Sequence, residues 1–493
     1  MSKQASWNLG GCGARGMVRI GALLALTLAA TGVAQAQTAT PATPAPAKAE
    51  DSSLTWHGIT LYGIIDIGVQ YDTHSAPFSD YFPATSGSLL QKNGYDSPTG
   101  LTSNNLSQSR IGLSGNEPIG GDWAAVFRLE TFFNPSSGDL SDALKSVTVN
   151  NGKPLTSQTL GVDSSVAGQL FGGAAYGGLS SPTIGTFTFG RNVTIVADGI
   201  SKYDPMGAAQ AFSVIGYSGT AAGGGDTEDR RLDQSLKYVG KYGPIHLGAL
   251  YEFGSYSGST DTGYQIQLGA EFGGFSADAY YFKKYDAISV SPLSVAQAQE
   301  VVNNCNTDAT TVPKPETVRC YSMNTALSGT VSDNKTYMIT ALWNLDPVPL
   351  KLYAGYEHIA FDNPTDPLPV GTVIIGGYQL AVVNNAAYDN EKTLEIFWAG
   401  VKWNLSPNLE ITGAYYGYKQ NSFATGKNAG CTTIVASQCS GNLDAVSALI
   451  DYRLTKRFDL YFGSFWNEVR DGLANGYFAR NNVATTAGVR FKF

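Results

Sequence analysis

The sequence predicts an all-β fold in which sixteen antiparallel strands close into a transmembrane barrel. Three observations carry the prediction. The composition favours strands and turns, with 57 Gly, 27 Tyr and 22 Phe among 493 residues and only 15% charged residues. Apolar and polar side chains alternate along many short segments, which is the period of a strand with two different faces. The connectors between these segments alternate between short and long, which is typical of a meander across a membrane.

Residues 1–36 have the pattern of a secretory signal peptide. Basic residues precede the apolar run IGALLALTLAA, and the AQA that ends at Ala36 supplies the small side chains that signal peptidase requires. Residues 37–55 are rich in Pro, Ala and Thr and poor in large apolar groups, so we expect a flexible leader. Residues 56–493 then form the barrel. Loss of the signal removes three basic groups and no acidic one, which moves the formal net charge from −8 to −11 and argues against nucleic-acid binding.

The segment GITLYGIIDIGVQY, residues 58–71, shows the alternation of the first strand. One face is apolar, and the other carries Asp66 among small and polar residues. The apolar face holds Ile59, Leu61, Ile65, Ile67, Val69 and Tyr71, and the opposite face holds Thr60, Tyr62, Asp66, Gly68 and Gln70. We therefore expect Asp66 on the side that faces water, in the lumen of the barrel.

The same alternation recurs along the chain. SRIGLSG and DWAAVFRLE place Arg110 and Arg128 opposite apolar side chains, and the last segment, TTAGVRFKF, ends on Phe493. Such segments begin near residues 57, 107, 122, 165, 185, 231, 245, 264, 275, 335, 350, 393, 409, 446, 458 and 485. A soluble β-sandwich is the alternative, but it has no reason to sort its loop lengths by parity. In hydrocarbon, open strand edges would leave backbone groups unpaired, so the sheet must close.

Four cysteines follow the signal peptide, in two pairs that are close in sequence. Cys305 and Cys320 lie in one polar, turn-rich stretch, and Cys431 and Cys439 lie in another. Four cysteines allow three connectivities. The short separations favour Cys305 with Cys320 and Cys431 with Cys439, each closing a loop in an oxidising compartment. A zinc site is the alternative, but the sequence has no CxxC and no His near these cysteines, so we expect no metal.

Five segments together resemble the Gram-negative general porins, most of all the trimeric sixteen-stranded type of betaproteobacteria. These segments are LYGIIDIGVQY, SQSRIGLSGNEPIGGDWAAVFRLETFFNPSSG, GTFTFGRN, RRLDQSLKY and the terminal AGVRFKF, and the resemblance covers nearly the whole mature chain. It implies a homotrimer in the outer membrane, in contact with lipid and lipopolysaccharide, with both termini in the periplasm. It also implies a water-filled pore for small hydrophilic solutes and ions in each barrel, narrowed by a third long loop that folds inward. The resemblance implies no cofactor.

Two features depart from the family pattern. The stretch TAAGGGDTEDRR stands where some relatives carry a Pro-Glu-Phe-Gly-Gly-like segment in loop 3, and the fourth strand lacks an arginine that several relatives have. Residues 286–334 and 360–392 form unusually long loops. A substrate-specific channel that uses these loops to bind a solute is therefore the alternative to simple diffusion.

Charged residues around the narrowest part of the pore are expected to set its selectivity. On the wall we expect Arg110 and Arg128, whose faces follow from the alternation, and Arg230 and Arg231, which flank the return of loop 3. The acidic residues expected on the loop are Asp198, Asp204, Asp226, Glu228 and Asp229. Together with the acidic net charge, they predict a weak preference for cations, since opposite charges share one cross-section.

An outer-membrane enzyme or an adhesin is a weaker alternative. The chain has only four histidines, which lack metal-ligand spacing, and it has no GxSxG motif. An adhesin would use the long loops and conduct no ions. We therefore predict a passive channel without enzymatic activity.

The chain ends on an aromatic residue. We expect Phe493 at the periplasmic aromatic girdle, where rings favour the membrane interface. The resemblance implies that Phe493 is also part of the signal that the insertion machinery recognises.

Overall fold

The computed structural model describes residues 54–81, 88–215, 230–254, 262–306, 323–368 and 374–493. The expected signal peptide and nearly all of the leader lie outside the described residues. So do Cys320 and three of the acidic residues expected on loop 3, namely Asp226, Glu228 and Asp229.

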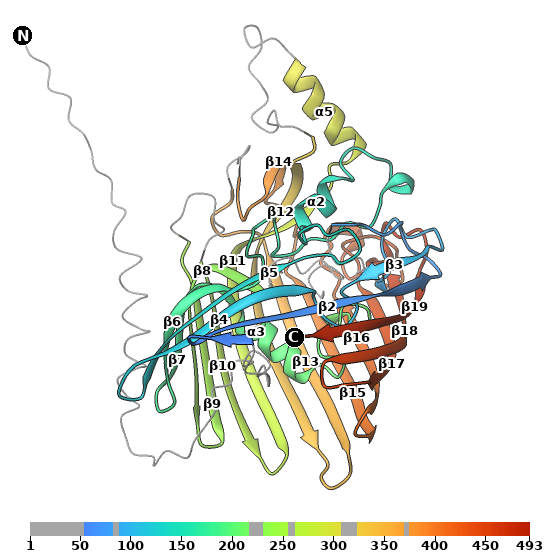
Figure 1. Ribbon diagram of the computed structural model, residues 1–493. Coiled ribbons are helices and arrows are strands. Elements are labelled where there is room, and N and C mark those ends of the chain that lie inside the picture. Colours follow the sequence, from blue (N-terminus) through green and yellow to red (C-terminus); the bar gives the residue numbers. More distant parts are fainter. Residues whose placement is uncertain (1–53, 82–87, 216–229, 255–261, 307–322, 369–373) are drawn as a thin grey trace, which may run out of the picture.

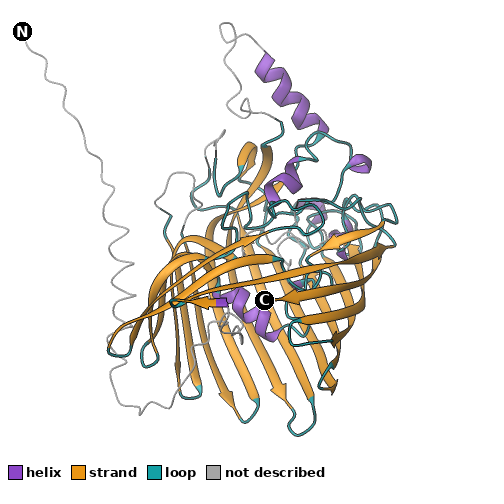
Figure 2. Cartoon of the chain, in the orientation of Figure 1, coloured by secondary structure: helices purple, strands orange, loops and turns teal. Residues whose placement is uncertain are grey.

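Sixteen strands form the wall of a closed barrel, each antiparallel to its neighbours (Figures 1 and 2). They are β2 (Ile59–Asp72), β4 (Arg110–Gly120), β5 (Trp123–Phe132), β6 (Ala175–Ser181), β7 (Gly185–Val193), β8 (Arg231–Tyr242), β9 (Ile245–Glu252), β10 (Gly263–Phe272), β11 (Phe275–Ser291), β12 (Ala326–Asn344), β13 (Leu350–Asp362), β15 (Lys392–Ser406), β16 (Leu409–Gln420), β17 (Gly441–Arg453), β18 (Phe458–Asp471) and β19 (Asn481–Lys492). The barrel closes because β19 pairs with β2, from Ala484 opposite Asp72 to Lys492 opposite Ile64. The predicted fold class is therefore confirmed.

Two predicted strand starts are wrong by about ten residues. β6 begins at Ala175 and not near residue 165, because its pairing with β5 starts only where Ala175 lies opposite Leu129. β12 begins at Ala326 and not near residue 335, because it continues along β11 beyond the rest of the wall and also pairs there with β14 (Gln379–Asn384). The other short strands, β1 (Thr55–Trp56) and β3 (Thr99–Ser103), both pair with β2.

Large apolar side chains cover the outside of the barrel. Along β10 and β12, for example, Leu268 is 56% exposed and Ile339 is 61% exposed. Exposed apolar side chains on this scale are unfavourable in water but fit a band of lipid hydrocarbon. Separately, no helix among the described residues is long and apolar enough to cross a membrane.

The connectors sort by length as the sequence predicts. Turns of two to five residues join the strands at one end of the barrel, and longer loops join them at the other. The loops carry the short helices α2 (Ala143–Thr148), η3 (Leu155–Ser157), α3 (Ile195–Tyr203), α5 (Val295–Asn306), η6 (Gly426–Asn428) and η7 (Gly472–Ala474). Loop 7, residues 421–440, is closed by a disulfide between Cys431 and Cys439, which confirms that predicted pair. The pair of Cys305 with Cys320 reaches outside the described residues and stays a prediction.

Candidate channel constriction

Loop 3 joins β7 to β8, and its described part, residues 194–215 and Arg230, enters the barrel through helix α3 (Figure 1). Thr194 caps the helix, since its side-chain oxygen accepts a hydrogen bond of 3.1 Å from the Ala197 N–H. Gln265, on the inner face of β10, accepts further hydrogen bonds from the N–H groups of Ile195 (2.9 Å) and Val196 (3.2 Å). The wall of the barrel therefore satisfies the backbone donors at the start of α3 and fixes where the helix begins.

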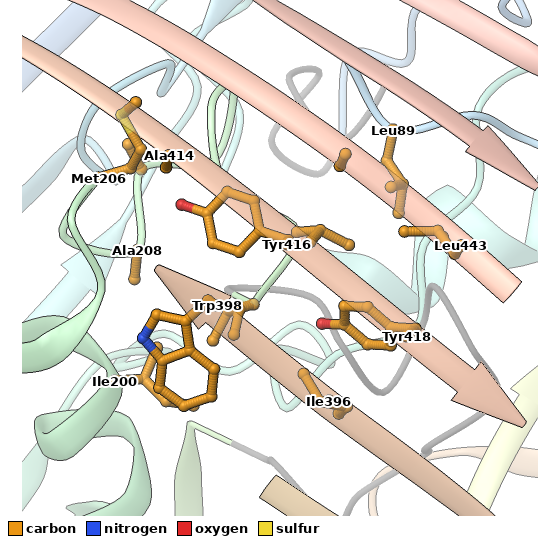
Figure 3. Close-up of a cluster of buried hydrophobic side chains, with 14 of the residues drawn as sticks. Leu89, Ile200, Met206, Ala208, Ile396, Trp398, Ala414, Tyr416, Tyr418 and Leu443 are labelled. Atoms are coloured by element: carbon orange, nitrogen blue, oxygen red, sulfur yellow. The ribbon is translucent and has the colours of Figure 1, made fainter. Parts of the chain in front are cut away.

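The apolar side of loop 3 packs against the inner wall. Ile200, Met206 and Ala208 of the loop meet Trp398 on β15 and Tyr416 on β16 in one buried cluster (Figure 3). The indole N–H of Trp398 also donates a 3.1 Å hydrogen bond to the Tyr203 carbonyl. Loop 3 is thus held against the part of the inner wall that β15 and β16 form.

Asp204 anchors the loop in this cluster. Its carboxylate is only 2% exposed and accepts hydrogen bonds from the Tyr416 hydroxyl (2.6 Å) and the Ala208 N–H (2.7 Å). Burial raises the pKa of the Asp204 carboxyl. The expectation that Asp204 faces the water column is therefore corrected: the loop bends around its carboxylate, and this bend depends on tertiary contacts.

A cluster of basic residues lies on the wall formed by β2, β4, β5 and β8. Its centre is the buried carboxylate of Glu130, which lies 2.5 Å from the guanidinium of Arg128 and 3.6 Å from that of Arg110. Tyr62 donates to the same carboxylate (3.0 Å) and accepts a hydrogen bond from Arg128 (2.7 Å). The guanidinium of Arg231 lies 4.4 Å from the Phe132 ring centre, and no ion pair with Arg231 is found in the part of the chain that the structure describes. Two of the four expected arginines, Arg110 and Arg128, therefore share the Glu130 carboxylate, and Arg231 lies within electrostatic range of it.

The polar side of α3 faces β8. Asp198 forms an ion pair with Lys237 (2.5 Å), and Lys237 also donates to the Val193 carbonyl (2.9 Å). Arg230, the fourth expected arginine, donates to the Ser201 hydroxyl of α3 at 3.5 Å. Asp198 therefore lies on loop 3 and Arg230 lies where the loop returns to the wall, but Asp198 is already neutralised by Lys237, which the sequence did not indicate.

Sequence reasoning missed Glu130, Tyr62 and Lys237 as members of this site. The alternation does place all three on the inner face of their strands. What it cannot supply is the register, which sets Tyr62 beside Gly112 and Gly112 beside Glu130. The sequence does contain a signal for Glu130. Arg110 and Arg128 both point inward on neighbouring strands, and buried arginines need a carboxylate within reach.

Asp66 lies on the inner face of β2, as predicted, but water does not reach it. The segment that follows β3 folds over it, so that its carboxylate accepts hydrogen bonds of 2.8 Å from the N–H groups of Leu106 and Ser107. The hydroxyl of Tyr461 donates a third, at 2.6 Å. The expectation that Asp66 lines open lumen is corrected: loop 1 uses it as an anchor.

Phe493 completes the closure of the barrel. Its N–H donates to the Gly63 carbonyl (3.1 Å), and its carbonyl accepts from the Gly63 N–H (2.9 Å). The ring covers Gly63 so closely that a Cβ added there would lie 2.3 Å from the ring. The part of Phe493 in membrane insertion stays a prediction.

The chain matches the family described as Gram-negative porin over residues 22–471. It belongs to the Gram-negative porin family. An outer membrane porin protein of Bordetella pertussis is 29% identical over 196 residues, which span 40% of this chain and 42% of that protein. Outer membrane porin protein 32 of Delftia acidovorans is 24% identical over 363 residues, or 70% of this chain and 87% of that protein.

Solved porins share the fold. The structure titled anion-selective porin from Comamonas acidovorans superposes with a TM-score of 0.55 at 17% identity, covering 88% of this chain and 99% of that one. A loop-deletion mutant of the Vibrio cholerae outer membrane protein OmpT gives a TM-score of 0.51 at 13% identity, with 88% and 99% covered. The protein is therefore an outer-membrane porin, a channel for passive diffusion.

Proposed function

We propose that this porin is a general diffusion channel whose constriction weakly favours small anions. The observation that carries the proposal is the cluster around Glu130, in which one carboxylate serves Arg110 and Arg128 while Arg231 adds a further positive charge. The carboxylate of Asp198 on helix α3 is neutralised by Lys237. The described side chains of the constriction therefore leave a net positive field.

The physical effect is a modest one. Low-dielectric walls focus the field of fixed charges into the water column, which concentrates ions of opposite sign. Salt at about 0.15 M screens this field over roughly 8 Å, so only charges that line the narrow segment contribute. Solvent-exposed charges interact by about 1 kcal/mol at contact distance. We therefore expect an anion preference of a few-fold.

The zero-current potential in a KCl gradient across a planar bilayer tests this proposal. Arg231→Gln removes one charge without removing an ion pair, so the ratio of chloride to potassium permeability is expected to fall by about twofold. Lys427→Gln in loop 7 is the matched control, because Lys427 is exposed and lies far along the chain from the constriction residues. Cation preference in the unmodified protein, or an equal shift in both variants, would refute the proposal.

A weak cation preference is the second candidate. It is favoured by the net charge of the mature chain, which moves from −8 to −11 when the signal with its three basic groups is removed, and by the run of Asp226, Glu228 and Asp229 in loop 3. If these carboxylates line the pore, replacing all three by amides shifts the zero-current potential towards anions. If they do not, the triple variant behaves like the unmodified protein.

We also propose that the mature protein, after loss of residues 1–36, is a homotrimer in the outer membrane, bound by lipid and lipopolysaccharide, with both termini in the periplasm. The apolar outer face of β2 and β4 offers a surface for subunit contact. Cross-linking followed by gel electrophoresis without heating tests the assembly. We assign the channel no enzymatic step.

A further inference from the structure

A cavity of about 490 Å³ lies among the long loops, and none of the constriction residues lines it. Four parts of the chain contribute: residues 89–93 of loop 1, residues 147–163 of loop 2, residues 289–295 where β11 leads into loop 5, and Tyr477 of loop 8. Its volume falls in the range of about 300–1,000 Å³ that is common for small-molecule sites.

The floor of the cavity is apolar and well packed. Leu90, Val147 and Leu293 lie beneath it and are almost completely buried, whereas Leu155 and Val295 are exposed at its rim. The exposed apolar side chains can bind the apolar body of a ligand by removing it from water. It offers little to a strongly hydrated inorganic ion.

The charged groups of the lining are mostly positive. Lys92 and Lys153 contribute two ammonium groups, and neither forms an ion pair within the part of the chain described by the structure. The one lining carboxylate, Asp163, is already engaged, since it accepts hydrogen bonds from the Tyr378 hydroxyl (2.9 Å) and from the Val290 N–H (3.0 Å). The cavity therefore has positive charge to offer a ligand and no free negative charge.

A lysine outside the cavity lining, Lys392, lies within electrostatic range of Lys92. Lys392, at the start of β15, is buried with its ammonium 5.0 Å from the Phe361 ring centre, and its charge interacts with that of Lys92. Loss of surrounding water lowers the pKa of Lys92. The two like charges repel each other, and because Lys92 is exposed, a bound anion can reach its ammonium and relieve that repulsion.

We propose that this cavity is a binding site for small organic anions with an apolar body, of the aryl- or alkylcarboxylate class. The carboxylate pairs with Lys92, and Lys153 adds attraction from the rim. The apolar body lies on the exposed side chains of Leu155 and Val295. Charge-assisted hydrogen bonds of this kind are about twice as strong as neutral ones, so the charge decides which ligands bind. The site goes beyond selectivity at the constriction and does not depend on it.

Isothermal titration of the detergent-solubilised mature protein with phenylpropionate tests this proposal. We expect Lys92→Gln to weaken phenylpropionate binding by about tenfold, which corresponds to roughly 1.4 kcal/mol. Phenylpropanol, the neutral analogue, is expected to bind the unmodified protein about as weakly as phenylpropionate binds the Lys92→Gln variant. Its own affinity should be the same in the unmodified protein and in Lys92→Gln. Lys427→Gln, which removes an exposed lysine of loop 7 outside the cavity, should leave binding unchanged.

A second variant tests the apolar half. Leu155→Ser changes an exposed rim residue, so it is not expected to disturb folding, and it should weaken phenylpropionate but not acetate. The proposal would be overturned if phenylpropionate bound Lys92→Gln and Lys153→Gln as tightly as it binds the unmodified protein. Acetate that binds the unmodified protein as tightly as phenylpropionate does would also overturn it. Loss of binding in Arg231→Gln would place the site at the constriction and would also overturn it. An unchanged zero-current potential in Arg231→Gln bears only on the selectivity proposed above.

Discussion

Replacing Trp398 by alanine should release loop 3 from the wall of the barrel. Trp398 is 2% exposed, packs against Ile200 and Ala208, and donates the 3.1 Å hydrogen bond to Tyr203. Truncating a buried tryptophan costs about 3–5 kcal/mol, and the lost hydrogen bond adds about 1 kcal/mol. The strand that carries Trp398 is held by its neighbours β13 and β16, so most of this cost falls on the docking of the loop.

A loss of about 4–6 kcal/mol raises the ratio of undocked to docked loop 3 by roughly 10³- to 10⁴-fold. Single-channel recording is the assay, with larger mean conductance and added current noise as the expected result. Trp398→Phe keeps an aromatic ring but loses the donor, so we expect an effect of roughly fivefold on the same ratio.

Trp343→Ala is the matched control, because it removes an equal side chain from the outer face of β12, where Trp343 is 49% exposed. Normal conductance and noise in a Trp398→Ala protein that reaches the membrane would refute the reasoning. That result would mean that contacts other than the Trp398 cluster hold the loop.

Two further predictions concern the C-terminus and the loops. Deletion of Phe493 uncovers Gly63 and removes two backbone hydrogen bonds, so immunoblotting of outer-membrane fractions should show several-fold less protein; wild-type amounts would contradict this. Non-reducing peptide mapping should find Cys431 joined to Cys439 and Cys305 joined to Cys320, and free thiols or a crossed pair would count against it. Reduction should increase proteolysis within loop 7 and leave barrel unfolding in denaturant unchanged, because the Cys431 disulfide closes a loop and not the wall.

The barrel could be predicted from the sequence because its cause is local. Each strand must show apolar side chains to lipid on alternate positions, and this period survives in the sequence whatever the neighbouring strand is. The start of β6 was placed too early because the stretch before Ala175 contains Val166, Leu170 and Phe171, whose apolar side chains resemble a strand although they belong to loop 2. Apolar side chains alone therefore do not mark where a strand begins.

The residues of the constriction were predictable only in part, because they also depend on the register between strands and on the path of loop 3. Alternation set Arg110 and Arg128 on the inner face, but strand register decided that both reach Glu130. The path of loop 3 decided that Asp204 turns into an apolar cluster while Asp198 faces β8. The strand register and the path of loop 3 both depend on contacts between residues far apart in sequence, which no single segment encodes.

The position of loop 3 should control how strongly the arginines act. Arg231 lies where the loop returns to β8, whereas Trp398 holds the loop through Tyr203 on the other side of the lumen. Arg231→Gln should therefore shift the zero-current potential with unchanged current noise, whereas Trp398→Ala should alter both, because a wider pore holds more screening salt. In the double variant, the shift caused by Arg231→Gln should be smaller than in the unmodified protein, a non-additivity expected when two residues act through one element. If Arg231→Gln shifts the zero-current potential equally in the unmodified protein and in Trp398→Ala, then loop 3 does not set the width of the pore beside the arginines.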